Sequence, residues 1–124
     1  MNKKKCDLLI RNACIVSMNS SRTIFSPGAV AISKSRIVDV GSDNKITQRI
    51  EAKEIIDAEG MTVSPGFVDI HTHLDAQIGW DPEMTPICWH GVTTALIGNC
   101  GLTFAPCKPD DVEILAGMME TVED

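Results

Sequence analysis

The sequence lacks several features by which common classes of protein are recognised. None of its apolar runs approaches the ~18 to 20 residues that a membrane-spanning helix needs. Positive charge is also scarce, since 11 lysine and arginine residues stand against 17 acidic ones and give a formal net charge of -6. Beyond Lys3–Lys5 there is no basic cluster. These shortages argue against a membrane protein and against a nucleic-acid-binding protein.

A secretion signal and a disulfide pattern are missing too. The apolar run behind Lys3–Lys5 is only Leu8–Ile10, whereas a signal peptide needs about 7 to 15 apolar residues. The cysteines are odd in number, and no two have the Cys-x-x-Cys spacing: Cys6, Cys14, Cys88, Cys100 and Cys107. We therefore expect a cytoplasmic protein without a disulfide framework. Most of these cysteines are expected to be small buried hydrophobic residues.

The first half of the sequence is typical of short strands. We expect a strand over residues 6–16, a hairpin over residues 29–41 that turns at Lys34-Ser35, and further strand over residues 54–63 with a turn at Glu59-Gly60. Short strands separated by turn residues indicate a small sheet or half of a β-sandwich. Because Ser-Pro-Gly follows at residues 64–66, we place a domain boundary there and assign residues 1–63 to part of a small β-sandwich domain.

The second half changes character. The pattern predicts a strand over residues 67–73, a short helix over 85–91, a strand over 92–101 that is apolar on both faces, and an amphipathic helix over 110–124 whose methionines belong to a core. Strand and helix in alternation indicate a parallel α/β unit. Two parallel strands with open edges do not make a stable sheet. We therefore expect residues 64–124 to begin a larger α/β domain and the sequence to be the N-terminal part of a longer chain.

Two histidines at the end of the strand predicted over residues 67–73 are candidate metal ligands. In an extended strand alternate residues share a face, so Asp69, His71 and His73 point the same way. Two imidazoles in this arrangement can converge on one ion. Asp69 is either a partner that orients one of them or simply a solvated acid. The same spacing also suits two polar residues at the frayed end of a strand, and the sequence alone leaves both interpretations open.

Cys100 strengthens the metal interpretation. It lies in Gly-Asn-Cys-Gly at the end of the strand predicted over residues 92–101, and parallel strands of one α/β unit end at the same edge of the sheet. Cys100, His71 and His73 therefore belong to the same edge, and a cysteine with two histidines makes a good zinc site. The alternative is a buried structural cysteine. His90, beside Gly91, is interpreted as a residue at a helix end and not as a ligand.

At this point the sequence resembles a known family. The segments "DLLIRNACIV", "AVAISKSRIVDVG" and "IIDAEGMTV" resemble the N-terminal β-segment of the amidohydrolase superfamily of metal-dependent hydrolases, and "SPGFVDIHTH" resembles its first barrel strand. Many members have glycine at the hairpin, where this sequence has Ser35. A longer and more specific match, to the N-acyl-D-amino-acid deacylases or D-aminoacylases, is "HTHLDAQIGWDPEMTPICWHGVTTALIGNCGLTFAP".

The resemblance implies a fold and an activity. The fold is α/β plus β: an N-terminal β-sandwich segment, then the first two β/α units of an incomplete (β/α)8 TIM barrel. The activity is zinc-dependent hydrolysis of the amide bond of small N-acyl-D-amino acids. His71, His73 and Cys100 match the metal ligands of the family, whereas its remaining ligands and its acid–base aspartate match no residue here. The alternatives are another amidohydrolase, such as a hydantoinase-like cyclic amidase, and a non-catalytic zinc-binding fragment.

Overall fold

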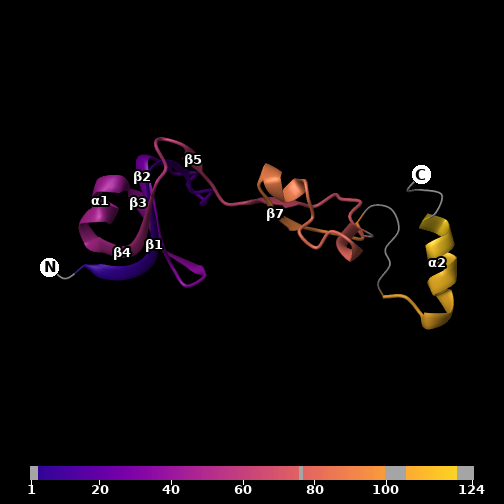
Figure 1. Cartoon of the computed structure of the whole chain (residues 1–124). Helices are drawn as coiled ribbons and strands as arrows, with labels where there is room; N and C mark the ends of the chain where they lie inside the picture. The colour runs from indigo at the N-terminus through magenta and orange to yellow at the C-terminus, as the bar shows by residue number, and fades with distance from the viewer. Residues whose placement is uncertain (1–2, 76, 100–105, 120–124) are drawn as a thin grey trace. The chain divides into compact units, whose positions relative to one another are not determined.

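The computed structural model describes residues 3–75, 77–99 and 106–119. It divides into two compact units, Met1–Pro65 and Gly66–Asp124, shown in Figure 1. Among the helices in these described ranges, none combines the length and the apolar character that crossing a membrane would require. That the first unit belongs to a β-sandwich, and the second to a barrel, stays a prediction.

The first unit is built on one mixed β-sheet. Its strand order is β3-β2-β1-β4, and β5 also pairs with β1. The strands are β1 (Lys4–Val16), β2 (Ile24–Ser33), β3 (Arg36–Ser42), β4 (Ile50–Asp57) and β5 (Thr62–Val63). The central strand β1 is antiparallel to β2 and parallel to both β4 and β5. The β-rich first half predicted from the sequence is therefore confirmed.

The hairpin between β2 and β3 turns at Lys34 and Ser35, as predicted. Lys34 takes a left-handed φ of 55°, and its N–H donates to Asp7 Oδ2 at 2.7 Å. Asp7 also accepts hydrogen bonds from Lys53 Nζ at 2.7 Å and from Ser33 Oγ at 3.3 Å. The bond from the Lys34 N–H, followed by that from Lys53, lowers the pKa of Asp7 to about 2. A carboxylate thus supports a turn that contains no glycine.

The central strand changes its parallel partner at Asn12. Residues before this point pair with β4 and residues after it pair with β5. Asn12 has a φ of 53°, its side-chain amide donates to Asp57 Oδ1 at 2.8 Å, and its carbonyl accepts the N–H of Gly60 at 2.8 Å. The predicted turn at Glu59 and Gly60 joins β4 to β5, and both of its residues have positive φ. One long strand can therefore hold two short ones end to end.

A short helix that the sequence analysis missed, α1 (Asp43–Arg49), packs on this sheet. Its Ile46 is fully buried in a cluster with sheet residues and the residue after the helix, namely Cys6, Leu9, Ala29, Ala31 and Ile50. The buried carboxylate of Asp43 accepts hydrogen bonds from Arg11 Nη2 at 3.1 Å and from the Asn12 N–H at 2.8 Å. The available signal was charge, since an acidic residue opens the helix and Arg49 closes it, in accord with the helix dipole.

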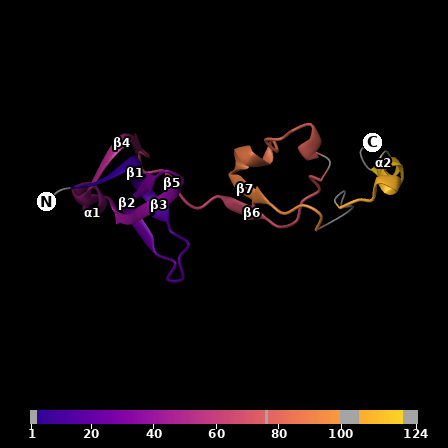
Figure 2. The same cartoon turned by 90° about the horizontal axis from the view of Figure 1, so that it is seen from below.

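The second unit contains a parallel pair of strands, β6 (Phe67–Asp69) and β7 (Val92–Ala95), which lie side by side in Figure 2. This confirms the predicted parallel pairing. Both strands are shorter than predicted. In the described part of the chain each strand pairs only with the other, so both end where this pairing ends. Residues 70–73 therefore lie outside the strand predicted over 67–73, and Leu96 and Ile97 are 51% and 41% exposed instead of covered.

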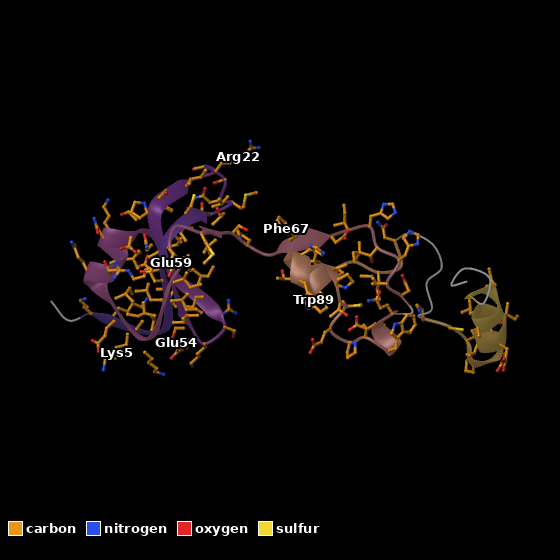
Figure 3. The ribbon with its side chains drawn as sticks, turned by 45° about the horizontal axis from the view of Figure 1, so that its top comes forward. Lys5, Arg22, Glu54, Glu59, Phe67 and Trp89 are labelled. Carbon is orange, nitrogen blue, oxygen red and sulfur yellow. The ribbon has the colours of Figure 1, made fainter. Side chains whose placement is uncertain are left out.

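Two short 3-10 helices, η1 (Gln77–Gly79) and η2 (Ile87–His90), lie between these strands. The helix predicted over residues 85–91 is thus a single 3-10 turn. Its N-cap is Pro86, and it ends at Gly91, which has a left-handed φ of 85°. Figure 3 shows Trp89 on η2 and Phe67 on β6, and both aromatic side chains are largely exposed.

The last helix, α2 (Val112–Met119), follows the 3-10 turn η3 (Pro109–Asp111). It lies within the helix predicted over residues 110–124, of which residues 120–124 fall outside the described ranges. The prediction that its methionines belong to a core is wrong for Met118, which is 47% exposed. Apolar periodicity predicted the helix correctly, but it does not show which part of the protein the helix packs against.

Candidate metal centre

The two candidate histidines follow β6 directly. His71 and His73 are both exposed, and they lie two and four residues beyond Asp69, the last residue of the strand. Their imidazole rings face each other with centroids 6.0 Å apart and planes inclined by 23°. The two rings therefore lie close together, although the sequence analysis placed them on a strand and the structure places them on the irregular segment that follows. That they converge on one metal ion stays a prediction.

Asp69 binds the backbone next to the first histidine. Its predicted roles were to orient an imidazole or to be a solvated acid, and in the structure Asp69 Oδ1 accepts the backbone N–H of His71 at 3.1 Å. The interaction closes a small turn at the end of β6, in which an aspartate side chain substitutes for a backbone acceptor two residues before its donor. Asp69 thus shapes the backbone that carries His71, and among the described residues its carboxylate forms no hydrogen bond with either ring.

The histidine segment is joined to the chain that follows β7. The N–H of Leu96 donates to the carbonyl of Asp69 at 2.8 Å, and the hydroxyl of Thr72 donates to the carbonyl of Leu96 at 2.8 Å. The side-chain amide of Asn99 donates to the carbonyl of Ile70 at 2.6 Å. Three bonds therefore hold residues 69–72 beside residues 96–99. Sequence reasoning missed Thr72 and Asn99, although both are polar residues next to candidate ligands.

The histidine pair fits part of a zinc site. Two imidazoles bound to one zinc at about 2.0–2.1 Å in tetrahedral geometry have ring centres roughly 5 Å apart, close to the 6.0 Å observed here. Nowhere in residues 3–75, 77–99 and 106–119 do three or more His, Cys, Asp or Glu side chains gather as a metal-holding group. The third predicted ligand, Cys100, lies outside the described residues. Of the three predicted ligands, the described chain therefore contains the two histidines, with no third candidate ligand beside them.

The loop of residues 77–85, which follows the histidines in the sequence, is organised by a carboxylate that the sequence analysis did not single out. Asp81 Oδ2 accepts the N–H and the hydroxyl of Thr85, both at 2.6 Å, and the side-chain amide of Gln77 at 3.0 Å. These bonds, above all those from the side chains of Thr85 and Gln77, lower the pKa of Asp81 below its ordinary value of 3.8. Gln77 also donates to the carbonyl of Thr85 at 2.6 Å, so η1 is tied to the start of η2.

The described cysteines and the third histidine form no metal-holding group with His71 and His73. Cys6 is buried in the core of the first unit, as predicted for a structural cysteine. Cys14, Cys88 and Cys107 are half-buried, so their predicted burial is only partial. His90 is the exposed last residue of η2, where the N–H of the following glycine continues the turn.

The chain belongs to the amidohydrolase family, whose family model matches residues 54–119, more than half of its length. It is 39% identical over 79 residues to the N-acyl-D-aspartate deacylase of Alcaligenes xylosoxydans xylosoxydans, covering 64% of this chain and 15% of that protein. It is also 33% identical over 100 residues to the D-aminoacylase of the same organism, covering 81% of this chain and 19% of that protein. The chain thus spans less than a fifth of the length of these relatives.

A solved structure and a relative of different activity are also similar. The structure is an N-acyl-D-glutamate deacylase from Bordetella bronchiseptica complexed with zinc and a phosphonate inhibitor; the TM-score is 0.68 at 28% identity, over 84% of this chain and 21% of that one. The relative is a 5-methylthioadenosine/S-adenosylhomocysteine deaminase of Lawsonia intracellularis, 39% identical over 69 residues, which are 56% of this chain and 16% of that protein. The fold is therefore that of the amidohydrolases.

Proposed function

We propose that this chain is part of a zinc-dependent hydrolase that cleaves the amide bond of small N-acyl-D-amino acids, giving a carboxylate and a D-amino acid. Membership of the amidohydrolase family and the similarity to two D-amino-acid deacylases support the proposal. His71, His73 and Cys100 are the proposed zinc ligands. Residues 64–124 then begin a (β/α)8 barrel, and residues 1–63 belong to a small β-sandwich. The cytoplasmic localisation stays a prediction.

The observation that carries the proposal is the stacked pair of His71 and His73 at the carboxyl end of a parallel strand pair. In barrels of alternating strands and helices, the catalytic groups stand at this end of the strands. Both rings are exposed, so a ligand can approach them. Asn99 precedes Cys100 directly in the sequence, and its bond to the carbonyl of Ile70 brings that part of the chain to the histidine segment.

The chemistry divides between the metal and the chain. Zinc, when bound, supplies a Lewis acid that activates water and polarises an acyl carbonyl. The chain's own residues would hold the zinc: the imidazoles of His71 and His73, which lie on one short segment, and the sulfur of Cys100. No residue of the chain is assigned as general acid or base. The aspartate that the resemblance implies for that role matches none of the 124 residues.

A matched set of histidine variants tests the proposal. The complete gene product is assayed for release of D-amino acids from N-acetyl-D-amino acids, with N-acetyl-L-amino acids as the stereochemical control. We expect His71→Ala and His73→Ala to lose zinc and activity, because each removes a ligand. His90→Ala, which changes the exposed histidine of η2, should keep both. The deacylase assignment would be refuted if the unaltered protein hydrolysed neither the D- nor the L-acyl amino acid but did turn over a cyclic ureide.

A deaminase is the second candidate function, because a 5-methylthioadenosine/S-adenosylhomocysteine deaminase is similar to the chain over 69 residues. Both candidates need a metal-activated water, so loss of zinc does not separate them. Incubation of the same protein with 5-methylthioadenosine does, since deamination releases ammonia and changes the absorbance of the base. Ammonia release without hydrolysis of acyl amino acids would favour the deaminase.

A further inference from the structure

The segment that carries the two histidines has no strand partner of its own. β6 ends at Asp69, and residues 70–73 lie outside any strand or helix. Without a ladder, the backbone dihedrals of such a segment are free to vary, and the directions of the imidazoles vary with them. Zinc needs its ligands within a few tenths of an ångström of fixed distances. Some other interaction must therefore hold the His71–His73 segment.

Thr72 supplies one such interaction. It lies between the two exposed histidines, yet it is itself only 6% exposed, and its hydroxyl donates to the carbonyl of Leu96 at 2.8 Å. Leu96 also donates its own N–H to the carbonyl of Asp69 at 2.8 Å. The two peptide groups that flank the Leu96 Cα are thus bound, one by the end of β6 and the other by the residue between the histidines, which fixes the direction of the chain from residue 69 to residue 72.

Asn99 supplies the second interaction. Its side-chain amide donates to the carbonyl of Ile70 at 2.6 Å, across 29 residues of sequence. Ile70 directly precedes His71, and it is largely exposed, so apolar packing contributes little to its position. The peptide group on the N-terminal side of His71 is therefore held by Asn99, and the side chain of Thr72 is held by the carbonyl of Leu96.

We propose that Thr72 and Asn99 are positioning residues of the metal centre: their two side-chain hydrogen bonds form a clamp that sets the directions of the His71 and His73 imidazoles before zinc binds. This inference rests on the proposed function, because it concerns the same two ligands. Residues that orient metal ligands through hydrogen bonds typically change metal affinity about 10- to 100-fold when they are replaced. Thr72 and Asn99 act one step further away, through the backbone, so we expect a loss of about tenfold.

The test measures zinc affinity and ligand geometry in the complete gene product. Zinc affinity is obtained by competition with a chromophoric chelator, and geometry from the absorption spectrum of the protein loaded with cobalt(II). Thr72→Val keeps the shape of the side chain and removes the hydroxyl, whereas Thr72→Ser keeps the hydroxyl. We expect about tenfold weaker zinc binding and an altered cobalt spectrum for Thr72→Val. Thr72→Ser should restore both.

Asn99→Ala and Thr94→Val complete the design. Asn99 is exposed, so its replacement is tolerated by the fold, and it should weaken zinc binding even if Thr72→Val does not fold. Thr94 is an exposed threonine of β7 whose side chain donates no hydrogen bond within the described part of the chain, and its variant should match the unaltered protein.

The outcomes separate the clamp from the proposed function. Unchanged zinc affinity and an unchanged cobalt spectrum in both Thr72→Val and Asn99→Ala overturn the clamp while the deacylase assignment stands. If the unaltered protein binds no zinc, the clamp and the proposed function fall together. An equal loss in Thr94→Val also overturns the clamp, because the effect would then follow from any change in this sheet.

Discussion

In the first unit ten hydrophobic side chains are buried, whereas in the second unit Thr72 is the one equally buried side chain among the residues that the structure describes. The first unit has strands on both sides of β1 and a helix on the sheet, so Ile46 and its neighbours are removed from water. The second unit has two short strands paired by backbone bonds. The side chains of Thr72 and Asn99 hold the segments that follow these strands, and Asp81 holds the loop between Gln77 and Thr85. Apolar burial stabilises the first unit, and individual hydrogen bonds shape the second.

This difference separates two kinds of substitution effect. Burial is a collective property, so losing one core side chain lowers the stability of a whole unit. A hydrogen bond to a specific backbone group acts locally, so its loss changes the geometry around that group. Substitutions in the first unit should therefore appear in the free energy of unfolding. Substitutions in the second unit should change the local geometry of the histidine segment or of the loop of residues 77–85.

The largest expected effect is in the core of the first unit. Ile46→Ala should lower the free energy of unfolding by about 2–5 kcal/mol, because it empties a fully buried site beneath α1. The matched control is Ile55→Ala on β4, where the side chain is 58% exposed and the change should stay within about 1 kcal/mol. Urea denaturation of the 124-residue chain, followed by circular dichroism, measures both. Equal transition midpoints for the two variants would contradict the proposed role of burial.

A backbone effect is expected in the second unit. Gly91→Ala forces a Cβ onto a residue with φ of 85°, and this atom would lie 3.4 Å from the Phe67 ring. The local cost should be about 1–2 kcal/mol. The Gly91 carbonyl accepts the Phe67 N–H at 2.9 Å, so hydrogen exchange of that amide reports the change.

The control for this backbone effect is Gly79→Ala. A Cβ at Gly79 meets nothing within 4 Å, and its φ is not in the left-handed range. Protection of the Phe67 amide should therefore be unchanged in Gly79→Ala. If the Phe67 amide were equally protected in Gly91→Ala, the left-handed conformation of residue 91 would not be required.

The smallest expected effect compares one carboxylate from each unit. Asp7 has its pKa lowered to about 2, first by the Lys34 N–H, and Asp81 has its pKa lowered, first by the hydroxyl of Thr85. A lowered folded-state pKa contributes stability above the ordinary value of 3.8, and this contribution is lost as the pH falls through the folded-state pKa. The hydrogen-exchange protection factor of the Lys34 amide should therefore fall between about pH 4 and pH 2, and that of the Thr85 amide should fall as the pH drops below about 4.

Carboxylate-to-amide variants give the control for this acid titration. Asp7→Asn should remove the pH dependence at Lys34 alone, and Asp81→Asn should remove it at Thr85 alone, because the two carboxylates contact different turns. Loss of protection at both amides in either variant would mean that acid unfolds the chain globally and not turn by turn.

The sequence predicted the elements better than their lengths. The strands of the first unit and the turns at Lys34-Ser35 and Glu59-Gly60 were read correctly, because turn residues and apolar runs are local signals. The segment of residues 70–73 was read as strand although it is irregular, because apolar alternation continues past the last ladder bond. Helix α1 was missed, since seven residues with one buried apolar side chain give almost no periodic signal.

The sequence by itself determined which residue types are available for a metal: two histidines one residue apart, and a cysteine after a predicted strand. Only the tertiary structure decided how the two imidazoles face each other, 6.0 Å apart on a segment outside any strand. It also decided that Thr72 and Asn99 bind carbonyl groups more than twenty residues away along the chain. Local patterns record propensity and periodicity, whereas a hydrogen bond between distant residues exists only once β6 and β7 have paired.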